Sequence, residues 1–195
     1  VTVLSRCLQF NLKQMTPVAI SAHLTEILVK EGVAAEAAGL AMLAQALPEK
    51  LYGRVADMGA GWGYLSRAVL TRPAVKSLDL IEADRAALDC ARQNITDPRA
   101  AFHWADATVY KPAQFWDAVV MNTPFHNSRD ADPGLGIAFL RAAQRGLSPS
   151  GVLWLVANRH LPYDRVLAEL FRTVEDVGAD TAFRLIRAAG PIRTR

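Results

Sequence analysis

Short apolar runs alternate with amphipathic stretches along the chain after residue 48. The apolar runs are bordered by turn residues, as buried strands are, and the amphipathic stretches repeat their apolar positions at helical spacing. Strands are expected at Arg54–Met58, Ser77–Ile81, Ala101–Trp104, Ala118–Met121 and Val152–Ala157. Helices are expected at Tyr64–Leu70, Arg85–Asn94, Gly134–Gly146 and Tyr163–Phe171. This alternation predicts βαβ units and a parallel sheet, and therefore an α/β domain.

The residues before this alternation have a helical pattern instead. Thr16 and Pro17 suit the N-cap and the first position of a helix, and the Ala-rich stretch Val33–Leu47 predicts a second one. We therefore divide the chain into a helical N-terminal segment, residues 1–48, and an α/β domain, residues 49–195.

The C-terminal tail carries two further apolar stretches, Thr173–Val177 and Ala182–Ile186. The residues between them are Gly178, Ala179 and Asp180. Gly and Asp at that point suit a turn, so a terminal antiparallel pair of strands is expected.

The composition indicates the class of protein but does not identify a binding partner. The chain has 195 residues, 51% of them hydrophobic and 21% charged, which suits one ordinary globular domain. The net charge of +3 is spread along the chain, so it tolerates a nucleic-acid partner but does not require one. Cys7 and Cys90 lack metal-type spacing, so neither a disulfide framework nor a metal site is expected. No apolar run is long enough to span a membrane and no signal sequence is recognisable, which favours the cytoplasm.

A glycine loop follows the first expected strand. The strand runs into three glycines at alternate positions and then into a helix, in the stretch Asp57-Met58-Gly59-Ala60-Gly61-Trp62-Gly63. Glycines there let the backbone approach a ligand at the carboxyl end of the sheet. The alternative is a tight strand-to-helix turn with no ligand.

The charge beside this loop separates two classes of cofactor. The dinucleotide fingerprint is G-x-G-x-x-G and brings a pyrophosphate to the helix N-terminus. Here the spacing is G-x-G-x-G, and Asp57 stands two residues before the first glycine. A carboxylate repels pyrophosphate, but it favours S-adenosylmethionine (SAM), which carries an ammonium and a sulfonium and no phosphate. The loop therefore predicts SAM as the cofactor.

Two more carboxylates stand at later strand ends. Glu82 ends the second strand and can accept both hydroxyls of a ribose, although a solvated strand-end charge is the alternative. Asp106 follows the third strand and can accept a hydrogen bond from the adenine amino group or serve as a helix N-cap. The expected cofactor site comprises Asp57, Gly59, Ala60, Gly61, Gly63, Glu82, Ala83, Asp106, Ala107 and Asn122.

The fourth strand ends in Asn122, Thr123, Pro124 and Phe125. An exocyclic amine on a purine is a poor nucleophile, because its lone pair is delocalised into the ring. Acceptors on its N–H groups, with an aromatic face holding the ring, favour the pyramidal nitrogen of the transition state. Asn122 and the backbone carbonyl of Thr123 supply the acceptors, and Phe125 supplies the stacking face. The alternative is an ordinary loop after a strand.

From the glycine loop, the acidic strand ends and this tetrapeptide, the chain resembles class I SAM-dependent methyltransferases over roughly residues 50 to 190. The resemblance implies a Rossmann-like, mostly parallel seven-stranded sheet with a C-terminal antiparallel hairpin. The tetrapeptide is similar to the Asn-Pro-Pro-Tyr/Phe motif of amino-group methyltransferases. It departs from that motif at Thr123, which keeps the backbone carbonyl and, standing before Pro124, an extended backbone.

A narrower resemblance includes His126 and the stretch Gly151–Tyr163, and it is to bacterial rRNA guanine-N2 methyltransferases. This implies ribosomal RNA or an assembled ribosomal subunit as partner, and a two-domain protein of which this chain would be the second domain. The first residue, Val instead of Met, is consistent with that. Leu161-Pro162-Tyr163 favours the small-subunit (16S) type, whereas Asn158-Arg159-His160 is similar to the large-subunit (23S) type.

Two alternative functions are kept beside this one. The same fold could methylate another amine or amide, such as a protein glutamine or a DNA adenine. It could also be a non-catalytic RNA-binding module, although such copies are expected to lose the glycines or the asparagine. The sequence leaves the oligomeric state and the modified nucleotide open.

Overall fold

The computed structural model of the protein describes residues 33–122 and 133–193. The helix expected to begin at Thr16 lies outside these residues, as do Thr123, Pro124 and Phe125 of the predicted catalytic tetrapeptide. The chain divides into two units between Ala35 and Glu36, and the fold below is that of the second unit.

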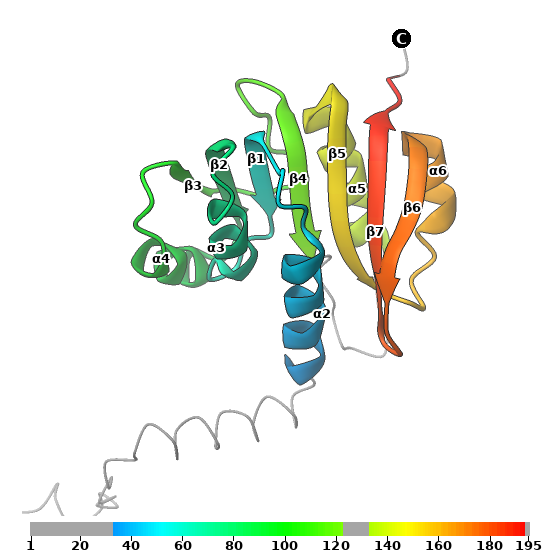
Figure 1. Ribbon diagram of the computed structural model, residues 1–195, viewed down its shortest axis with the longest axis horizontal. Helices are drawn as coiled ribbons and strands as arrows, with labels where there is room; N and C mark the ends of the chain where they lie inside the picture. Colours follow the sequence, from blue (N-terminus) through cyan, green and yellow to red (C-terminus); the bar gives the residue numbers. More distant parts are fainter. Residues whose placement is uncertain (1–32, 123–132, 194–195) are drawn as a thin grey trace, which may run out of the picture. The chain divides into compact units, whose positions relative to one another are not determined.

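A seven-stranded sheet forms the centre of this unit, in the order β3-β2-β1-β4-β5-β7-β6 (Figure 1). The strands are β1 (Gly53–Met58), β2 (Val75–Glu82), β3 (Ala100–Trp104), β4 (Trp116–Asn122), β5 (Leu147–Asn158), β6 (Phe171–Ala179) and β7 (Phe183–Pro191). The pairs among β1 to β5 are parallel, and β7 is antiparallel to both β5 and β6. The predicted class I methyltransferase sheet with its C-terminal antiparallel hairpin is confirmed.

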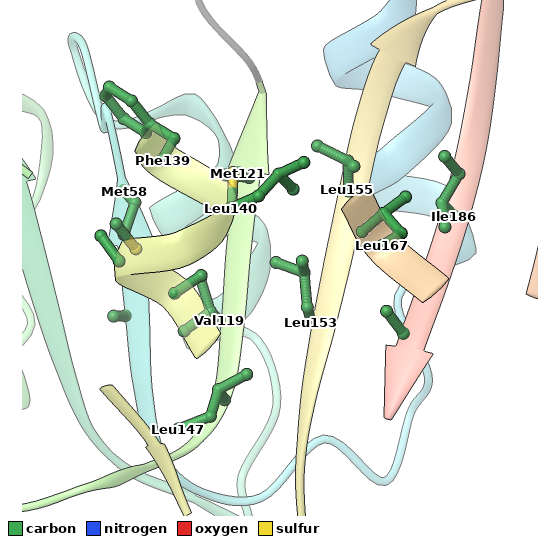
Figure 2. Packing of buried hydrophobic residues seen from close by; sticks show 14 of the residues in the cluster. Met58, Val119, Met121, Phe139, Leu140, Leu147, Leu153, Leu155, Leu167 and Ile186 are labelled. Carbon is green, nitrogen blue, oxygen red and sulfur yellow. The ribbon is translucent and has the colours of Figure 1, made fainter. Parts of the chain in front are cut away.

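Helices cover both faces of the sheet. They are α2 (Val33–Ala46), α3 (Tyr64–Leu70), α4 (Arg85–Asn94), α5 (Pro133–Gly146) and α6 (Asp164–Leu170). Residues of α2, α3 and α4 pack on one face, in a cluster that includes Leu43 and Val69 of the helices and Val120 of β4. Residues of α5 and α6 pack on the other; Figure 2 shows Leu140 and Leu167 there, beside side chains of the central strands. Buried strands with both faces covered are what a parallel sheet requires.

Most of the predicted bounds differ from the observed ones, by one to five residues, and two of these differences have a clear cause. Helix α6 was expected to include Phe171, but Phe171 is buried as the first residue of β6, with an extended φ of −132°. Strand β5 begins at Leu147 and not at Val152, because Leu147 already pairs with Trp116 across a register shift. In both cases a long-range contact, which local pattern does not record, fixes the boundary.

The parallel strands bring the predicted site to one edge. Met58 at the end of β1 pairs with Ile81 of β2 on one side and with Met121 of β4 on the other. The next residues, Glu82 and Asn122, are the last of their strands. Open α/β sheets bind their ligands at this carboxyl edge. Among the described helices, none is long and apolar enough to cross a bilayer.

Candidate active site

The glycine loop is a left-handed turn between β1 and α3. Gly59, Gly61 and Gly63 have φ values of 73°, 53° and 90°, a region that side chains other than glycine rarely adopt. The loop is tied to the neighbouring strand, because the N–H groups of Gly59 and Ala60 both donate to the carbonyl of Ile81, at 2.9 and 3.2 Å. A Cβ on Gly63 would lie 2.6 Å from the Ile95 side chain, whereas one on Gly61 would meet nothing within 4 Å. Gly63 therefore serves close packing, and Gly61 faces open space.

Asp57 is buried beneath this loop, with 1% of its surface exposed. Its carboxylate accepts a hydrogen bond from the Ser66 hydroxyl at 2.7 Å. Burial raises the pKa of Asp57 to about 7, against the lowering effect of the Ser66 bonds; the nearby Glu82 charge raises it a little further. A buried carboxyl group whose pKa lies near neutral pH strongly favours binding of a cation, because the cation stabilises its charged form.

Glu82 connects the end of β2 to the glycine loop. One carboxylate oxygen accepts from the N–H of Gly61 at 2.8 Å, and the other accepts from the N–H of Asp84 at 2.8 Å. The sequence predicted a cofactor role for Glu82 but did not predict this bond to the loop. Each oxygen has a second lone pair, so the bonds leave acceptor capacity for a ribose hydroxyl.

Two cavities open at this edge. The larger, of about 450 Å³, is lined by Gly59, Ile81, Glu82, Ala83, Asp106, Ala107, Asn122, Leu135 and Phe139. The smaller, of about 170 Å³, is lined by Leu40, Asp57, Gly59, Ala60, Gly61, Trp62, Tyr64, Leu65 and Asn122. Gly59 and Asn122 line both, so the cavities meet at these two residues. Of the predicted cofactor residues, Gly63 lines neither cavity and instead caps α3.

Asp106 lies on the wall of the larger cavity and also closes a turn. Its Oδ1 accepts from both the backbone N–H and the hydroxyl of Thr108, at 2.8 and 2.7 Å. The alternative, in which Asp106 caps a helix, is wrong, because Asp106 closes a turn and the described residues 105–115 contain no helix. Asp106 nevertheless lines the larger cavity, beside Ala107.

Asn122 presents an acceptor without a donor. Its side-chain Oδ1 is buried, and the described part of the chain offers it no hydrogen-bond partner. Burying such an oxygen unpaired costs free energy, so native structures almost always pair it. At the junction of the two cavities, the missing donor is one that a ligand can supply. The described residues also contain no group of three or more His, Cys, Asp or Glu side chains that could hold a metal ion.

The fold and the sequence now identify the class of protein. The profile of the family described as "Methyltransferase small domain" matches residues 29–187. The chain belongs to this family, and its fold is that of class I SAM-dependent methyltransferases.

Two similar curated proteins act on ribosomal RNA, according to their names. The chain is 34% identical over 140 residues to the ribosomal RNA large subunit methyltransferase G of Ectopseudomonas mendocina. The matched region covers 70% of this chain and 37% of that protein. It is 28% identical over 148 residues to the ribosomal RNA small subunit methyltransferase C of Shewanella loihica. The matched region covers 75% of this chain and 43% of that protein. The chain thus spans less than half the length of these relatives.

Solved structures share the fold. A T. thermophilus 16S rRNA N2 methyltransferase, in complex with AdoMet and guanosine, superposes with a TM-score of 0.66 at 22% identity, over 92% of this chain and 44% of that one. A SAM-dependent O-methyltransferase from Thermotoga maritima superposes with a TM-score of 0.63 at 16% identity, over 80% of this chain and 66% of that one. Because amino-group and O-methyltransferases share this fold, the fold alone does not identify the acceptor.

Proposed function

We propose that this chain is the catalytic domain of a SAM-dependent methyltransferase that modifies the exocyclic N2 amine of a guanine in ribosomal RNA. The observation that carries the proposal is the unpaired Oδ1 of Asn122, where the two cavities meet. The sulfonium of SAM joins its adenosine half to its methionine half. A donor with one half in each cavity therefore has its reactive methyl group beside Asn122.

The polar groups of each cavity fit the half assigned to it. The larger cavity carries Glu82 for the ribose and Asp106 for the adenine amino group, with Ala83 and Ala107 on the apolar wall. The smaller cavity carries the Asp57 carboxylate for the ammonium of the methionine half. Gly61, Ala60 and Gly59 bring backbone close to the ligand, and their N–H groups already donate to Glu82 and Ile81, so these groups are not free to bind a phosphate.

SAM supplies the methyl group, and the chain's part is to activate and orient the acceptor amine. The Asn122 Oδ1 accepts one N–H of the amine, which localises the nitrogen lone pair and stabilises the charge that develops on nitrogen. The backbone carbonyl of Thr123 accepts the second N–H, Pro124 keeps Thr123 extended, and Phe125 stacks on the guanine; these three roles rest on the motif. The amine loses its proton after methyl transfer, so a strong general base is not needed.

Ribosomal RNA is proposed because the similar curated proteins carry it in their names. Relatives named for the large and for the small subunit both match, so the resemblance to the 16S type made by Leu161-Pro162-Tyr163 gives a preference for 16S rRNA. A guanine reaches the carboxyl edge only if it is unpaired or flipped from its helix. The proposed substrate is therefore an exposed guanine in 16S rRNA or in its subunit, with 23S rRNA as the alternative.

The test is Asn122→Ala, with Asn158→Ala as the matched control. Asn158 likewise ends a strand at this edge, but its Oδ1 already accepts a bond from the N–H of His160. Labelled SAM is incubated with 16S and 23S rRNA and with both subunits from an unmodified strain, and the product nucleoside is mapped. We expect Asn122→Ala to abolish N2-methylguanosine and to leave SAM affinity nearly intact by calorimetry, and Asn158→Ala to keep the parent rate. Methylation by Asn122→Ala at the parent rate would show that Asn122 has no catalytic role.

A further inference from the structure

The wall of the larger cavity belongs to an unusual connection. Residues 105–115 run from β3 at the sheet edge to β4 at its centre, past β2 and β1, and the described chain has no helix there. The first residues of this connection include Asp106 and Ala107, which line the cavity. A segment without regular backbone hydrogen bonds needs other contacts to hold one conformation.

A polar cluster formed by Asp79, His103, Tyr110 and Trp116 lies against this connection. The two oxygens of the Asp79 carboxylate contact Nε2 of His103 at 2.9 Å and accept from the indole N–H of Trp116 at 2.7 Å. The hydroxyl of Tyr110 contacts the other ring nitrogen of His103, Nδ1, at 3.2 Å, and the Tyr110 ring stacks on Trp116 at an interplanar angle of 8°. The His103 side chain is 30% exposed, and that of Asp79 is 15% exposed.

The bonds of this cluster have a consistent direction. Because the Asp79 carboxylate can only accept, Nε2 of His103 carries the proton and donates to it. With the ring in its neutral form, Nδ1 is then an acceptor, and the Tyr110 hydroxyl donates to it. Tyr110 is thereby fixed from its side-chain end to two strands, β2 and β3.

Tyr110 is also bonded through its backbone to the cavity wall. Its N–H and that of Val109 donate to the carbonyl of Asp106, at 3.0 and 3.3 Å. The wall begins at Ala105, whose N–H donates to the carbonyl of Glu82 at 3.0 Å. The turn that presents Asp106 is thus held at its start by β2 and at its end by Tyr110.

We infer that Tyr110 and His103, anchored on Asp79, are positioning residues that hold the Ala105–Tyr110 turn in the conformation that binds the adenosine half of the cofactor. The inference rests on the proposed SAM site and adds to it residues that touch neither the cofactor nor the acceptor. Its consequence is selective: loss of the cluster weakens the adenosine half of the site and leaves the methionine half and the acceptor site unchanged.

Tyr110→Phe tests this, because it removes the hydroxyl and keeps the ring that stacks on Trp116. Dissociation constants are measured for SAM and for methylthioadenosine, which has the adenosine half without the amino-acid end, well below the unfolding temperature. We expect both constants to rise by the same factor, roughly three- to tenfold, the amount that one hydrogen bond contributes. The KM for SAM should rise with them, while kcat at saturating SAM stays within about twofold of the parent.

Three comparisons make the result specific. Tyr52→Phe makes the same chemical change at an exposed tyrosine and should alter neither constant. Asp57→Asn should weaken SAM and leave methylthioadenosine unchanged, which is the opposite selectivity. In a His103→Ala background, Tyr110→Phe should have no further effect, because the hydroxyl has already lost its partner.

The outcomes separate this inference from the proposed function. If Tyr110→Phe lowers only the unfolding temperature and both constants keep their parent values, the cluster is structural and the inference is wrong. If the parent protein binds neither methylthioadenosine nor SAM measurably, the proposed function itself is wrong.

Discussion

The Glu82 carboxylate accepts a hydrogen bond from the backbone N–H of Gly61 at 2.8 Å, and so joins the end of the second strand to the glycine loop. Glu82 is the last residue of β2, and Gly61 lies three residues beyond the end of the adjacent parallel strand β1, so a single side chain can span the gap. The bond fixes the loop before any ligand arrives. Preorganisation of this kind improves affinity, because ordering the loop is no longer part of the cost of binding.

We expect Glu82→Gln to weaken SAM binding at least tenfold and to lower the melting temperature. A glutamine amide has one acceptor oxygen, so it can satisfy either Gly61 or Asp84 but not both, and its NH₂ then faces a backbone donor; each lost bond is worth about 1 kcal/mol. Calorimetry with SAM and a thermal melt measure the two effects. Glu169→Gln is the control, since Glu169 is half exposed and its one ion pair within the described residues is with Arg165 at 3.1 Å. Parent-like affinity in Glu82→Gln would contradict a role for this carboxylate.

The glycine loop predicts a contrast between Gly63→Ala and Gly61→Ala. Both residues have positive φ, so alanine costs about 1 kcal/mol of backbone strain at either position. At Gly63 the new Cβ also meets Ile95 at 2.6 Å, whereas at Gly61 it meets nothing. Gly63→Ala should therefore unfold at a clearly lower denaturant concentration than Gly61→Ala, and Gly61→Ala should lose SAM affinity with a smaller loss of stability. Equal midpoints for the two variants would contradict this account of the loop.

The sequence predicted the regular elements well where local chemistry determines them. The bounds Tyr64–Leu70 and Arg85–Asn94 are confirmed without change. The second helix begins after Asp84, whose carboxylate accepts from the N–H groups of Ala86 and Ala87, a cap that local sequence is sufficient to indicate. The parallel pairing of β1 to β5 is confirmed, and it was predictable because helices α3, α4 and α5 separate most of these strands along the chain.

The sequence did not predict contacts between residues far apart in the chain. Asp79 and Trp116 are 37 residues apart and bond in the polar cluster, yet neither has a neighbouring pattern that marks it. The bond of Glu82 to Gly61 was missed for the same reason. The roles of Thr123, Pro124 and Phe125 stay predictions, since these residues lie outside the described chain.

SAM affinity should depend on pH through Asp57. Burial raises the pKa of Asp57 to about 7, so the carboxyl is increasingly neutral below that pH. The ammonium of SAM stays protonated there, because α-amino groups have a pKa near 8. Binding then requires Asp57 to lose its proton, and affinity should fall by up to about tenfold for each pH unit below 7. In Asp57→Asn the affinity should be low and nearly independent of pH between about 5.5 and 7. Calorimetry across that range measures both slopes, and parallel slopes would exclude Asp57 as the titrating group.

The stability of the cofactor-free protein should also depend on pH through Asp57. Unlike SAM affinity, this contribution to stability should be larger at low pH. The folded pKa of Asp57 lies above its unfolded value of 3.8, so the folded state holds a proton that the unfolded state has released. This contribution to stability is fully present below pH 3.8 and is lost as pH rises to about 7, by an amount on the order of 4 kcal/mol.

Asp57→Asn keeps an acceptor for the Ser66 hydroxyl and avoids the buried charge, so it should be more stable than the parent at pH 8 and differ little at pH 4. Asp89→Asn is the opposite control: desolvation raises the pKa of Asp89, but the bonds to Arg92 and Arg85 outweigh it and lower the pKa, so that variant should lose stability at pH 8. Denaturant midpoints at the two pH values test this, and an equal Asp57→Asn minus parent difference at both would rule out a buried carboxylate that ionises near neutrality.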